Sequence, residues 1–303
     1  MEHHEHTHTH SHSHHHPTQI TKLFVIGIIL NASFVLIELI AGFFAGSLAL
    51  ITDAGHNFGD VAGLAMVLVA EKLSKRKANS KYTYGYGKTT VLVALANAAL
   101  LLIGVGAIAL EAILRIHSPH IVEGKTVSIV AFIGIIINGL TALLFFRDKE
   151  SDLNIKGAYL HMASDAIVSL GVVISGILII YTHYEWIDTA MSLLICVVII
   201  WSTFGLLKDS LRLSLDGVPD EIKIEKIRHF LLNIPEVADI HDLHIWALST
   251  KENALTAHLL IKEKVGDDFI MHIRKELTHH FNISHTTIQL EASDSTFICE
   301  QKC

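Results

Sequence analysis

Two histidine–aspartate pairs stand inside strongly apolar parts of this sequence. His56 and Asp60 lie in the string TDAGHNFGD, and His161 and Asp165 lie in HMASD, so each pair is four residues apart. On a helix this spacing puts both side chains on one face, one turn apart. Zn²⁺ takes four nitrogen or oxygen ligands in a tetrahedron. The sequence therefore predicts one metal site built from both pairs, provided that their two helices are neighbours.

The charge of this four-residue set favours a transported ion. Two aspartates cancel the charge of a divalent cation, so an occupied site is formally neutral. Metal binding needs deprotonated ligands and releases protons, and histidine titrates near neutral pH. A site of this kind that opens alternately to each side exchanges metal for protons. The alternative is that each pair is a hydrogen-bonded tie between helices, but the repetition of the pair on two segments favours metal.

Two further carboxylates fall in the same apolar region. Asp53 precedes His56 by one helical turn. It either orients the histidine ring through the nitrogen that does not bind metal or lies at the outer vestibule. Glu38 falls midway along the preceding segment and is either a proton relay or a polar contact between helices. Charged groups inside a bilayer cost roughly 2.5–3.5 kcal/mol each, so both are functional candidates.

The elements that carry these residues are long apolar segments. Hydrophobic residues make up 51% of the 303 residues and charged residues 17%, against about 25% charged residues in soluble domains. A membrane helix needs roughly 20 apolar residues. Six segments qualify, at about 22–44, 48–70, 89–114, 126–146, 157–181 and 187–207. The first is too long for a cleavable signal peptide, and no basic region precedes it.

Lysine and arginine are unevenly distributed among the loops. Residues 72–88 hold six of them and residues 147–156 hold three, whereas residues 181–188 hold none. Positively charged loops stay on the cytosolic side of a membrane. With six spans, both chain termini are then cytosolic too, and residues 20–208 form the transmembrane domain. His56 then lies roughly 14 Å along a helix that enters from outside, close to the midplane.

The chain begins with a histidine-rich tract. Nine of the first 16 residues are histidine, alternating with Thr, Ser and Glu. A tract without apolar content is expected to be disordered, and short histidine-rich tracts indicate metal binding. Residues 1–19 are therefore predicted to be a cytosolic tail that captures metal ions. An affinity tag is the alternative, although tags are usually unbroken runs.

Residues 209–303 read as a soluble cytosolic domain. Residues 220–232 predict a helix, VADIHDLHIWAL and ALTAHLLIKE predict a hairpin, residues 267–281 predict a second helix, and HTTIQLE predicts a last strand. The order αββαβ indicates a small open α/β sandwich, an α+β domain. The net charge of −7 argues against binding of nucleic acid, which calls for a basic surface.

Histidines of this domain are further candidate ligands. His241 and His244 are three residues apart on a strand, so they are expected to face opposite sides of the sheet and not to share an ion. His258 lies on the paired strand beside either of them, and Glu291 lies on the last strand. Near the C-terminus, Cys299 and Cys303 either close a thiolate site or are exposed thiols.

Six strings of the sequence resemble those of the cation diffusion facilitators, especially the bacterial zinc and cobalt–zinc–cadmium resistance exporters and the animal vesicular zinc transporters. In chain order the strings are SLALITDAGHNFGD, TYGYGK, NIKGAYLHMASDAIVSLGVV, VPDEI, HDLHIWAL and SHTTIQLE. The resemblance implies six transmembrane helices, a metallochaperone-like cytosolic domain and a homodimer. It also implies a tetrahedral transport site at the two His–Asp pairs, with histidine at the position of His56 indicating a preference for zinc.

The resemblance further implies regulatory metal sites in the cytosolic domain. His241, His258 and Glu291 match the positions that the zinc-transporter branch uses. In that branch, the histidine-bearing N-terminus and C-terminal cysteines of the dimer partner complete these sites. For the present chain, Cys299 and Cys303 are the cysteines that would take this part.

The function predicted from the sequence is export of a divalent metal ion, foremost Zn²⁺, from the cytosol in exchange for protons, across the bacterial cytoplasmic membrane. Zn²⁺ is then a substrate and a regulatory ligand, and no cofactor or enzymatic activity is expected.

One alternative is a broader zinc, cadmium and cobalt exporter. A membrane zinc hydrolase needs an open coordination position and a general base, and the apolar segments hold no HExxH motif. A passive metal channel needs weak binding at several sites, whereas four converging ligands predict tight binding.

Overall fold

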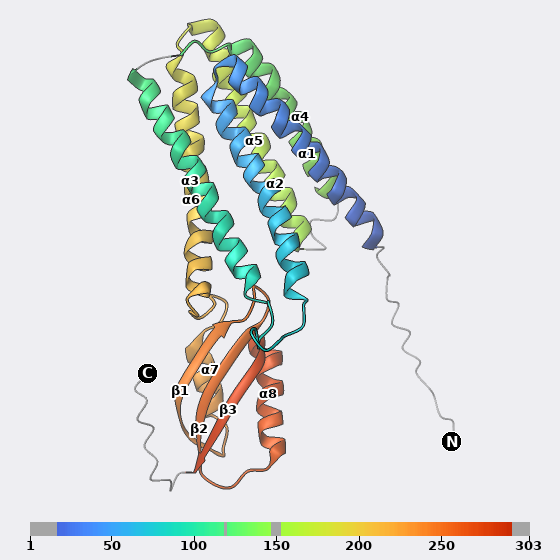
Figure 1. Ribbon diagram of the computed structural model, residues 1–303, viewed down its shortest axis with the longest axis vertical. Coiled ribbons are helices and arrows are strands. Elements are labelled where there is room, and N and C mark those ends of the chain that lie inside the picture. Colours follow the sequence, from blue (N-terminus) through green and yellow to red (C-terminus); the bar gives the residue numbers. More distant parts are fainter. Residues whose placement is uncertain (1–16, 118–119, 147–152, 293–303) are drawn as a thin grey trace, which may run out of the picture. The chain divides into compact units, whose positions relative to one another are not determined.

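The computed structural model describes residues 17–117, 120–146 and 153–292 (Figure 1). The histidine-rich residues 1–16 and the cysteines Cys299 and Cys303 lie outside these ranges. The chain packs as two compact units. One comprises the described residues up to Asn57 together with His120–Met191, and the other comprises Phe58–Pro119 and the described residues from Ser192 onward.

All six segments predicted to span a membrane are helices. They are α1 (Pro17–Ala45), α2 (Leu48–Ser74), α3 (Thr89–His117), α4 (Gly124–Phe146), α5 (Leu153–Thr182) and α6 (Trp186–Ser214). α1 begins at Pro17, five residues before the predicted start at about residue 22, and proline is favoured in the first turn of a helix. Over the described residues, α3, α4, α5 and α6 are long and apolar enough to cross a membrane, and the apolar part of α1, Ile29–Ala45, is shorter. The prediction of a helical membrane domain is confirmed.

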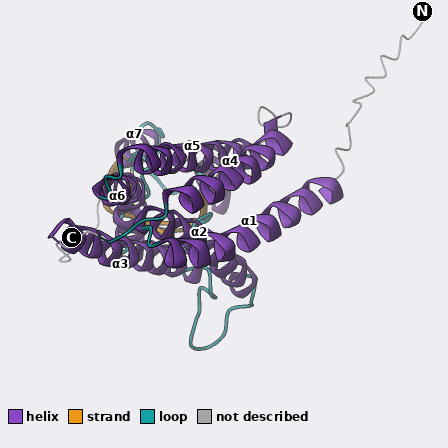
Figure 2. Cartoon of the chain, turned by 90° about the horizontal axis from the view of Figure 1, so that it is seen from above, coloured by secondary structure: helices purple, strands orange, loops and turns teal. Residues whose placement is uncertain are grey.

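In the first unit, α4 packs along α5 and α1 packs against α4 (Figure 2). Residues without large side chains allow α4 and α5 to approach closely. A Cβ atom added to Gly124 would lie 2.6 Å from the carbonyl oxygen of Gly176, and one added to Gly176 would lie 2.4 Å from Oγ of Ser128. Small residues at helix contacts are typical of membrane proteins, because association there depends on close packing.

The start of α2 is fixed by a polar cluster. Gly46 precedes it with φ of 67°, and a Cβ atom there would lie 2.5 Å from the carbonyl oxygen of Ile121. Ser47 accepts a hydrogen bond from the Leu50 amide at 3.1 Å, as an N-cap residue does. The carboxylate of Asp188, in the first turn of α6, accepts bonds from Ser47 Oγ at 2.5 Å and from the Leu48 amide at 2.6 Å. These contacts fix where α2 begins, and therefore where His56 lies, two turns further along the helix.

The C-terminal part of the second unit has the predicted αββαβ order. Its elements are α7 (Ile224–Leu232), β1 (Val237–Ala247), β2 (Asn253–Ile261), α8 (Asp267–Phe281) and β3 (Ile283–Ala292). β2 is the central strand, antiparallel to β1 and parallel to β3. The helices cover one face of the sheet, where the fully buried side chains include Ile227, Leu231, Leu255, Leu259, Ile273, Leu277 and Ile283. The other face carries the polar residues described below.

β1 contains an extra residue relative to β2 at two points, between Val237 and Asp239 and between His241 and His244. His241 pairs with His258, but three residues along β1 from His241 to His244 correspond to only two along β2. Within this bulge Asp242 has φ of 53°, a left-handed conformation that Asp tolerates better than most residues. The expectation that His241 and His244 face opposite sides is therefore wrong, because a bulge shifts the alternation of the strand by one residue. The residues of this stretch that face the core are Ile240, Leu243 and Ile245.

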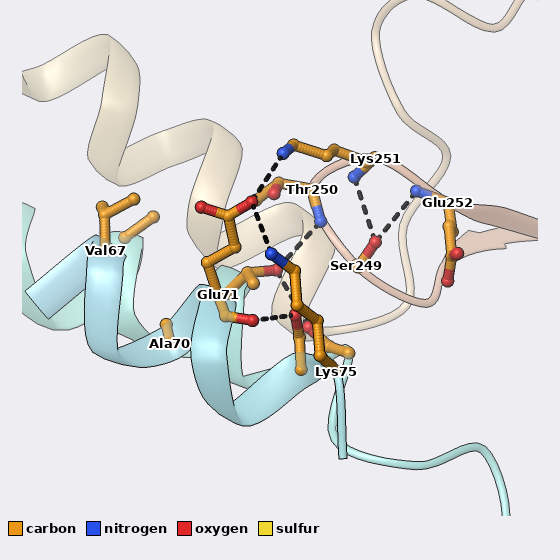
Figure 3. Close-up of a pocket in the computed structure, with 12 residues that line it drawn as sticks. Val67, Ala70, Glu71, Lys75, Ser249, Thr250, Lys251 and Glu252 are labelled. Atoms are coloured by element: carbon orange, nitrogen blue, oxygen red, sulfur yellow. Dashed lines mark hydrogen bonds and ion pairs between the residues drawn. The ribbon is translucent and has the colours of Figure 1, made fainter. Parts of the chain in front are cut away.

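Within the second unit, the turn between β1 and β2 contacts the last turns of α2 and the start of α3. Figure 3 shows Lys251 and Lys75 facing the Glu71 carboxylate, at 3.4 Å and 3.6 Å. The amide of Thr250 donates to Thr90 Oγ1 at 3.0 Å. Between them lies a cavity of about 390 Å³, lined by both apolar and polar side chains. Because the hairpin is anchored here, it joins the strands of the sheet to two apolar helices.

A second link in this unit comes from the lysine of the GYGK string. Lys88 Nζ lies 2.6 Å from Asp216 Oδ1 and donates to the carbonyl oxygen of Ala247 at 3.0 Å. Asp216 follows α6, and Ala247 ends β1. The Lys88 side chain therefore joins the residues before α3 to the segment after α6 and to the sheet.

Candidate metal centres

The first candidate centre lies in the first unit, between α2 and α5. The buried carboxylate of Asp165 faces two imidazole rings: His56 Nε2 lies 3.8 Å from Oδ1, and His161 Nε2 lies 3.7 Å from Oδ2. The two rings are 6.2 Å apart between centroids and nearly perpendicular. Asp165 is 2% exposed, whereas His161 is 40% exposed. Three of the four predicted transport-site residues thus lie together, and the two helices are neighbours.

The distances in this cluster are close to those of a zinc site. Zn²⁺ binds nitrogen and carboxylate oxygen at roughly 2.0–2.2 Å, so neighbouring ligands of a tetrahedron lie about 3.3–3.5 Å apart. The separations of 3.7 Å and 3.8 Å exceed this by a few tenths of an ångström. Asp60, the fourth predicted ligand, lies on α2 one turn beyond His56, and this spacing puts both on one helix face.

A buried polar network adjoins this centre. Ser169 of α5 donates a hydrogen bond to Asp53 Oδ2 at 3.2 Å, and both residues are buried. The Glu38 side chain of α1 is fully buried beside Asp53 and Asn57. Asp53 therefore connects α2 to both α1 and α5. Its predicted role in orienting the His56 ring stays a prediction, as does the choice between the two roles of Glu38.

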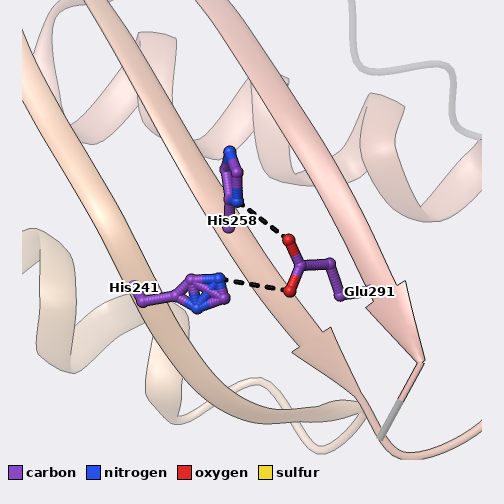
Figure 4. Close-up of side chains that lie close together, drawn as sticks. All are labelled: His241, His258 and Glu291. Carbon is purple, nitrogen blue, oxygen red and sulfur yellow. Dashed lines mark ion pairs between the residues drawn. The ribbon is translucent and has the colours of Figure 1, made fainter. Parts of the chain in front are cut away.

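The second candidate centre lies on the polar face of the sheet, where the three strands each contribute one side chain (Figure 4). Glu291 of β3 is central: its Oε2 lies 3.2 Å from His241 Nε2 and its Oε1 lies 2.8 Å from His258 Nδ1. One ligand atom from each residue can be chosen so that all three lie within 4.8 Å of one another. His258 is 18% and Glu291 14% exposed, and His241 is 39% exposed.

The donor set of this second centre fits a zinc ion. Nε2 of His241 and Nδ1 of His258 are buried and make no hydrogen bond with any described residue, although each faces a carboxylate oxygen. Two imidazole nitrogens and one carboxylate leave one tetrahedral position for a further ligand. Cross-strand pairing of His241 with His258 explains how residues 17 positions apart in the sequence meet.

Asp242 is a neighbour of this centre that sequence reasoning missed. Its Oδ2 lies 3.5 Å from Nε2 of His258, and its Oδ1 lies 3.0 Å from Nε2 of His244. The spacing of apolar residues held a signal for the bulge that positions it. Ile240, Leu243 and Ile245 are three and then two residues apart, and a regular strand with one buried face has apolar residues at every second position.

The sequence of this chain is similar to cation efflux proteins along most of its length. The model of the cation efflux transmembrane domain matches residues 24–213, and that of the cation efflux protein cytoplasmic domain matches residues 219–293. The cation efflux system protein CzcD of Alcaligenes sp. (strain CT14) is 38% identical over 279 residues, covering 91% of this chain and 87% of the relative.

Two further relatives carry names that include a metal. The zinc transporter ZitB of Yersinia pestis is 37% identical and covers 89% of this chain and 88% of its own length. The cadmium, cobalt and zinc/H(+)-K(+) antiporter of Bacillus subtilis (strain 168) is 33% identical and covers 93% of each chain. Because the matches to both domain models and to nearly full-length relatives agree, this multi-pass membrane protein belongs to the cation efflux family.

Proposed function

We propose that this chain exports divalent metal ions from the cytosol in exchange for protons, with Zn²⁺ as its main substrate. The observation that carries the proposal is the buried Asp165 carboxylate, which two imidazoles from two different helices face at 3.7 Å and 3.8 Å. The names of the relatives, a zinc transporter and a cadmium, cobalt and zinc/H(+)-K(+) antiporter, support the same activity.

The ligand set accounts for both the substrate and the coupling. His56, His161 and Asp165 supply two nitrogens and one carboxylate, and Asp60 supplies the second carboxylate from the next turn of α2. Two carboxylates neutralise Zn²⁺, which reduces the cost of holding the ion among apolar helices. When zinc leaves, the same groups take up protons, because imidazole and carboxylate bind a metal ion only in their deprotonated forms.

The surrounding topology follows from charge and helix number. α1 to α6 would all cross the bilayer, the basic segments 72–88 and 147–156 would face the cytosol, and both termini would be cytosolic. The membrane is then the cytoplasmic membrane of a bacterium, consistent with the bacterial relatives. The functional unit would be a homodimer held partly by the cytosolic domain.

The centre on the sheet would be regulatory. His241, His258 and Glu291 would hold a zinc ion that stays bound and reports the cytosolic metal concentration, with the histidine-rich residues 1–16 capturing ions nearby. Cys299 or Cys303 of the partner subunit would supply the remaining ligand. A Zn²⁺ ion held here supplies a structural crosslink among three strands and no chemistry of its own.

Proteoliposomes that contain the purified chain, with a zinc dye and a pH dye inside, test the transport proposal. A zinc gradient should drive zinc across the membrane together with proton movement in the opposite direction. Cadmium and cobalt, tested in turn, measure how broad the selectivity is. Zinc movement without any proton movement would indicate a channel and would contradict the proposal, as would the absence of zinc flux at every imposed pH gradient.

A further inference from the structure

Five side chains form a continuous row on the polar face of the sheet. In spatial order they are His241, Glu291, His258, Asp242 and His244, so imidazoles alternate with carboxylates. The nitrogen–oxygen separations between successive members are 3.2, 2.8, 3.5 and 3.0 Å. The first three members are the proposed regulatory centre. The last two lie beyond it, and Asp242 faces its His258.

His258 occupies the middle of this row and uses its two ring nitrogens differently. Nδ1 faces Glu291 at 2.8 Å and Nε2 faces Asp242 at 3.5 Å. A neutral imidazole carries a proton on one nitrogen and a lone pair on the other. A ligand ring therefore binds metal well when an acceptor holds the proton on the nitrogen that points away from the metal.

Asp242 is well placed to be that acceptor. It is only 16% exposed, and its other oxygen lies 3.0 Å from Nε2 of His244, which restrains the carboxylate from a second side. The bulge in β1 puts Asp242 there, since its left-handed backbone, with φ of 53°, turns the strand beside His258. A regular strand would have placed His244 on the other face and removed this restraint.

We propose that Asp242 is a positioning residue of the regulatory metal centre: it holds the His258 ring in the tautomer and orientation that leave Nδ1 for the metal ion. The inference rests on the proposed regulatory centre and adds to it a residue that does not touch the metal. The separation of 3.5 Å is long for a hydrogen bond, and we expect metal at Nδ1 to shorten it, because the bound metal makes the Nε2–H group a stronger donor.

The left-handed backbone of Asp242 decides which variants are informative. Asp242→Gly removes the carboxylate but accepts a positive φ. Asp242→Asn also tolerates this conformation and keeps an oxygen that can accept from His258, without the charge. Asp239→Asn is the matched control, because it removes the same charge from an exposed residue of the same strand.

The test uses the full-length protein with Asp60→Ala and Asp165→Ala, so that the transport centre does not bind. Zinc affinity is measured by competition with a chromophoric chelator, and His258→Ala on the same background gives the contribution of all other sites, including residues 1–16. We expect Asp242→Gly to weaken the His258-dependent site by about 10–100-fold. Asp242→Asn should weaken it less, and Asp239→Asn should leave it unchanged.

A second readout needs no metal. In protein labelled with ¹⁵N-histidine, the ring signals lost in His258→Ala identify His258, and these should show one dominant tautomer that becomes a mixture in Asp242→Gly.

Wild-type zinc affinity and an unchanged tautomer in Asp242→Gly would overturn the inference. Asp242→Gly and Asp242→Asn could instead lose zinc affinity equally and unfold at an equally lowered temperature. That result would also overturn the inference, because it would show that Asp242 has a structural role only. No difference between His258→Ala and the background would remove the regulatory centre itself, while zinc export is judged separately by proteoliposome flux.

Discussion

The two candidate metal centres use the same donor types on two different scaffolds. In the helical centre, Asp165 faces His56 and His161 at 3.7–3.8 Å, and the ligands repeat at four-residue intervals along α2 and α5. In the sheet centre, Glu291 faces His241 and His258 at 2.8–3.2 Å, and each strand supplies one ligand. Among the described residues, only the sheet centre has three ligand atoms that all lie within 4.8 Å of one another.

This difference indicates how the same types of ligand can serve either release or retention of a metal ion. Ligands on separate helices lose contact when the helices shift, so a bound ion can be passed on. Ligands on paired strands are fixed by the hydrogen bonds of the sheet, and here they stand above a closely packed core. We therefore assign transport to the helical centre and retention to the sheet centre, and each prediction below separates the two.

The largest expected effect is the loss of transport when a carboxylate of the helical centre is removed. Asp165→Ala, or Asp60→Ala, should lower zinc flux by more than about 100-fold, since even residues outside the ligand set cost about 10–100-fold in metal affinity. Folding, dimerisation and zinc affinity of the sheet centre should stay intact. Ser164→Ala, which removes a hydroxyl that donates to the Leu160 carbonyl of its own helix, is the control. Normal flux from either aspartate variant would exclude that residue from the mechanism.

Removal of a ligand from the sheet centre should affect zinc binding there and leave transport largely intact. His258→Ala should abolish zinc binding at the sheet centre, because it removes one of three ligands there. Maximal zinc flux should change by no more than about fivefold, the lower end of the range for coupling between distant sites. Flux in proteoliposomes and equilibrium binding are measured on the same preparation. Complete loss of flux would show that the sheet centre belongs to the transport path.

A smaller effect is expected from the histidine-rich tract. Deletion of residues 2–16 should raise the zinc concentration needed for half-maximal flux and leave maximal flux unchanged, because captured ions raise the local concentration and do not alter the path. A chain whose nine histidines in this tract are replaced by Gln controls for length. Loss of all transport on deletion would mean that the tract is part of the path.

The smallest effect is expected at the contact between the hairpin and α2. Lys251 and Glu71 are 78% and 42% exposed, and exposed ion pairs in water contribute little. Lys251→Ala should therefore change zinc flux by less than about twofold, with Lys264→Ala, an exposed lysine after β2, as the control. A drop comparable to that of Asp165→Ala would show that this contact transmits motion between the two centres.

Much of the helical centre could be predicted from the sequence, for a physical reason. Apolar runs near 20 residues long identify membrane helices without knowledge of their partners, and the four-residue spacing of His161 and Asp165 fixes their common face. The contacts of Asp53 could not be predicted, because Ser169 and Glu38 belong to other helices and only packing brings them together. The same holds for Asp188, which caps α2 from the start of α6.

The sheet centre was less predictable, because strand alternation fails at a bulge. The αββαβ order and the pairing of β1 with β2 followed from the pattern of apolar residues and the short turn. The face on which His244 lies could not be predicted in this way. The bulge at Asp242, which has a positive φ, moves each later side chain of the strand to the opposite face of the sheet. Asp242 was missed for the same reason: its neighbours depend on the backbone conformation at that single position.

The most direct test of the central claim is zinc X-ray absorption on a chain with His241→Ala and His258→Ala that lacks residues 2–16. This chain retains the helical centre as the site for a single bound ion. We predict one zinc ion per chain, with four nitrogen or oxygen neighbours at about 2.0–2.2 Å and the scattering signature of two imidazole rings. A sulfur neighbour at about 2.3 Å, or a shell of six water oxygens, would contradict a transport site made of two histidines and two aspartates.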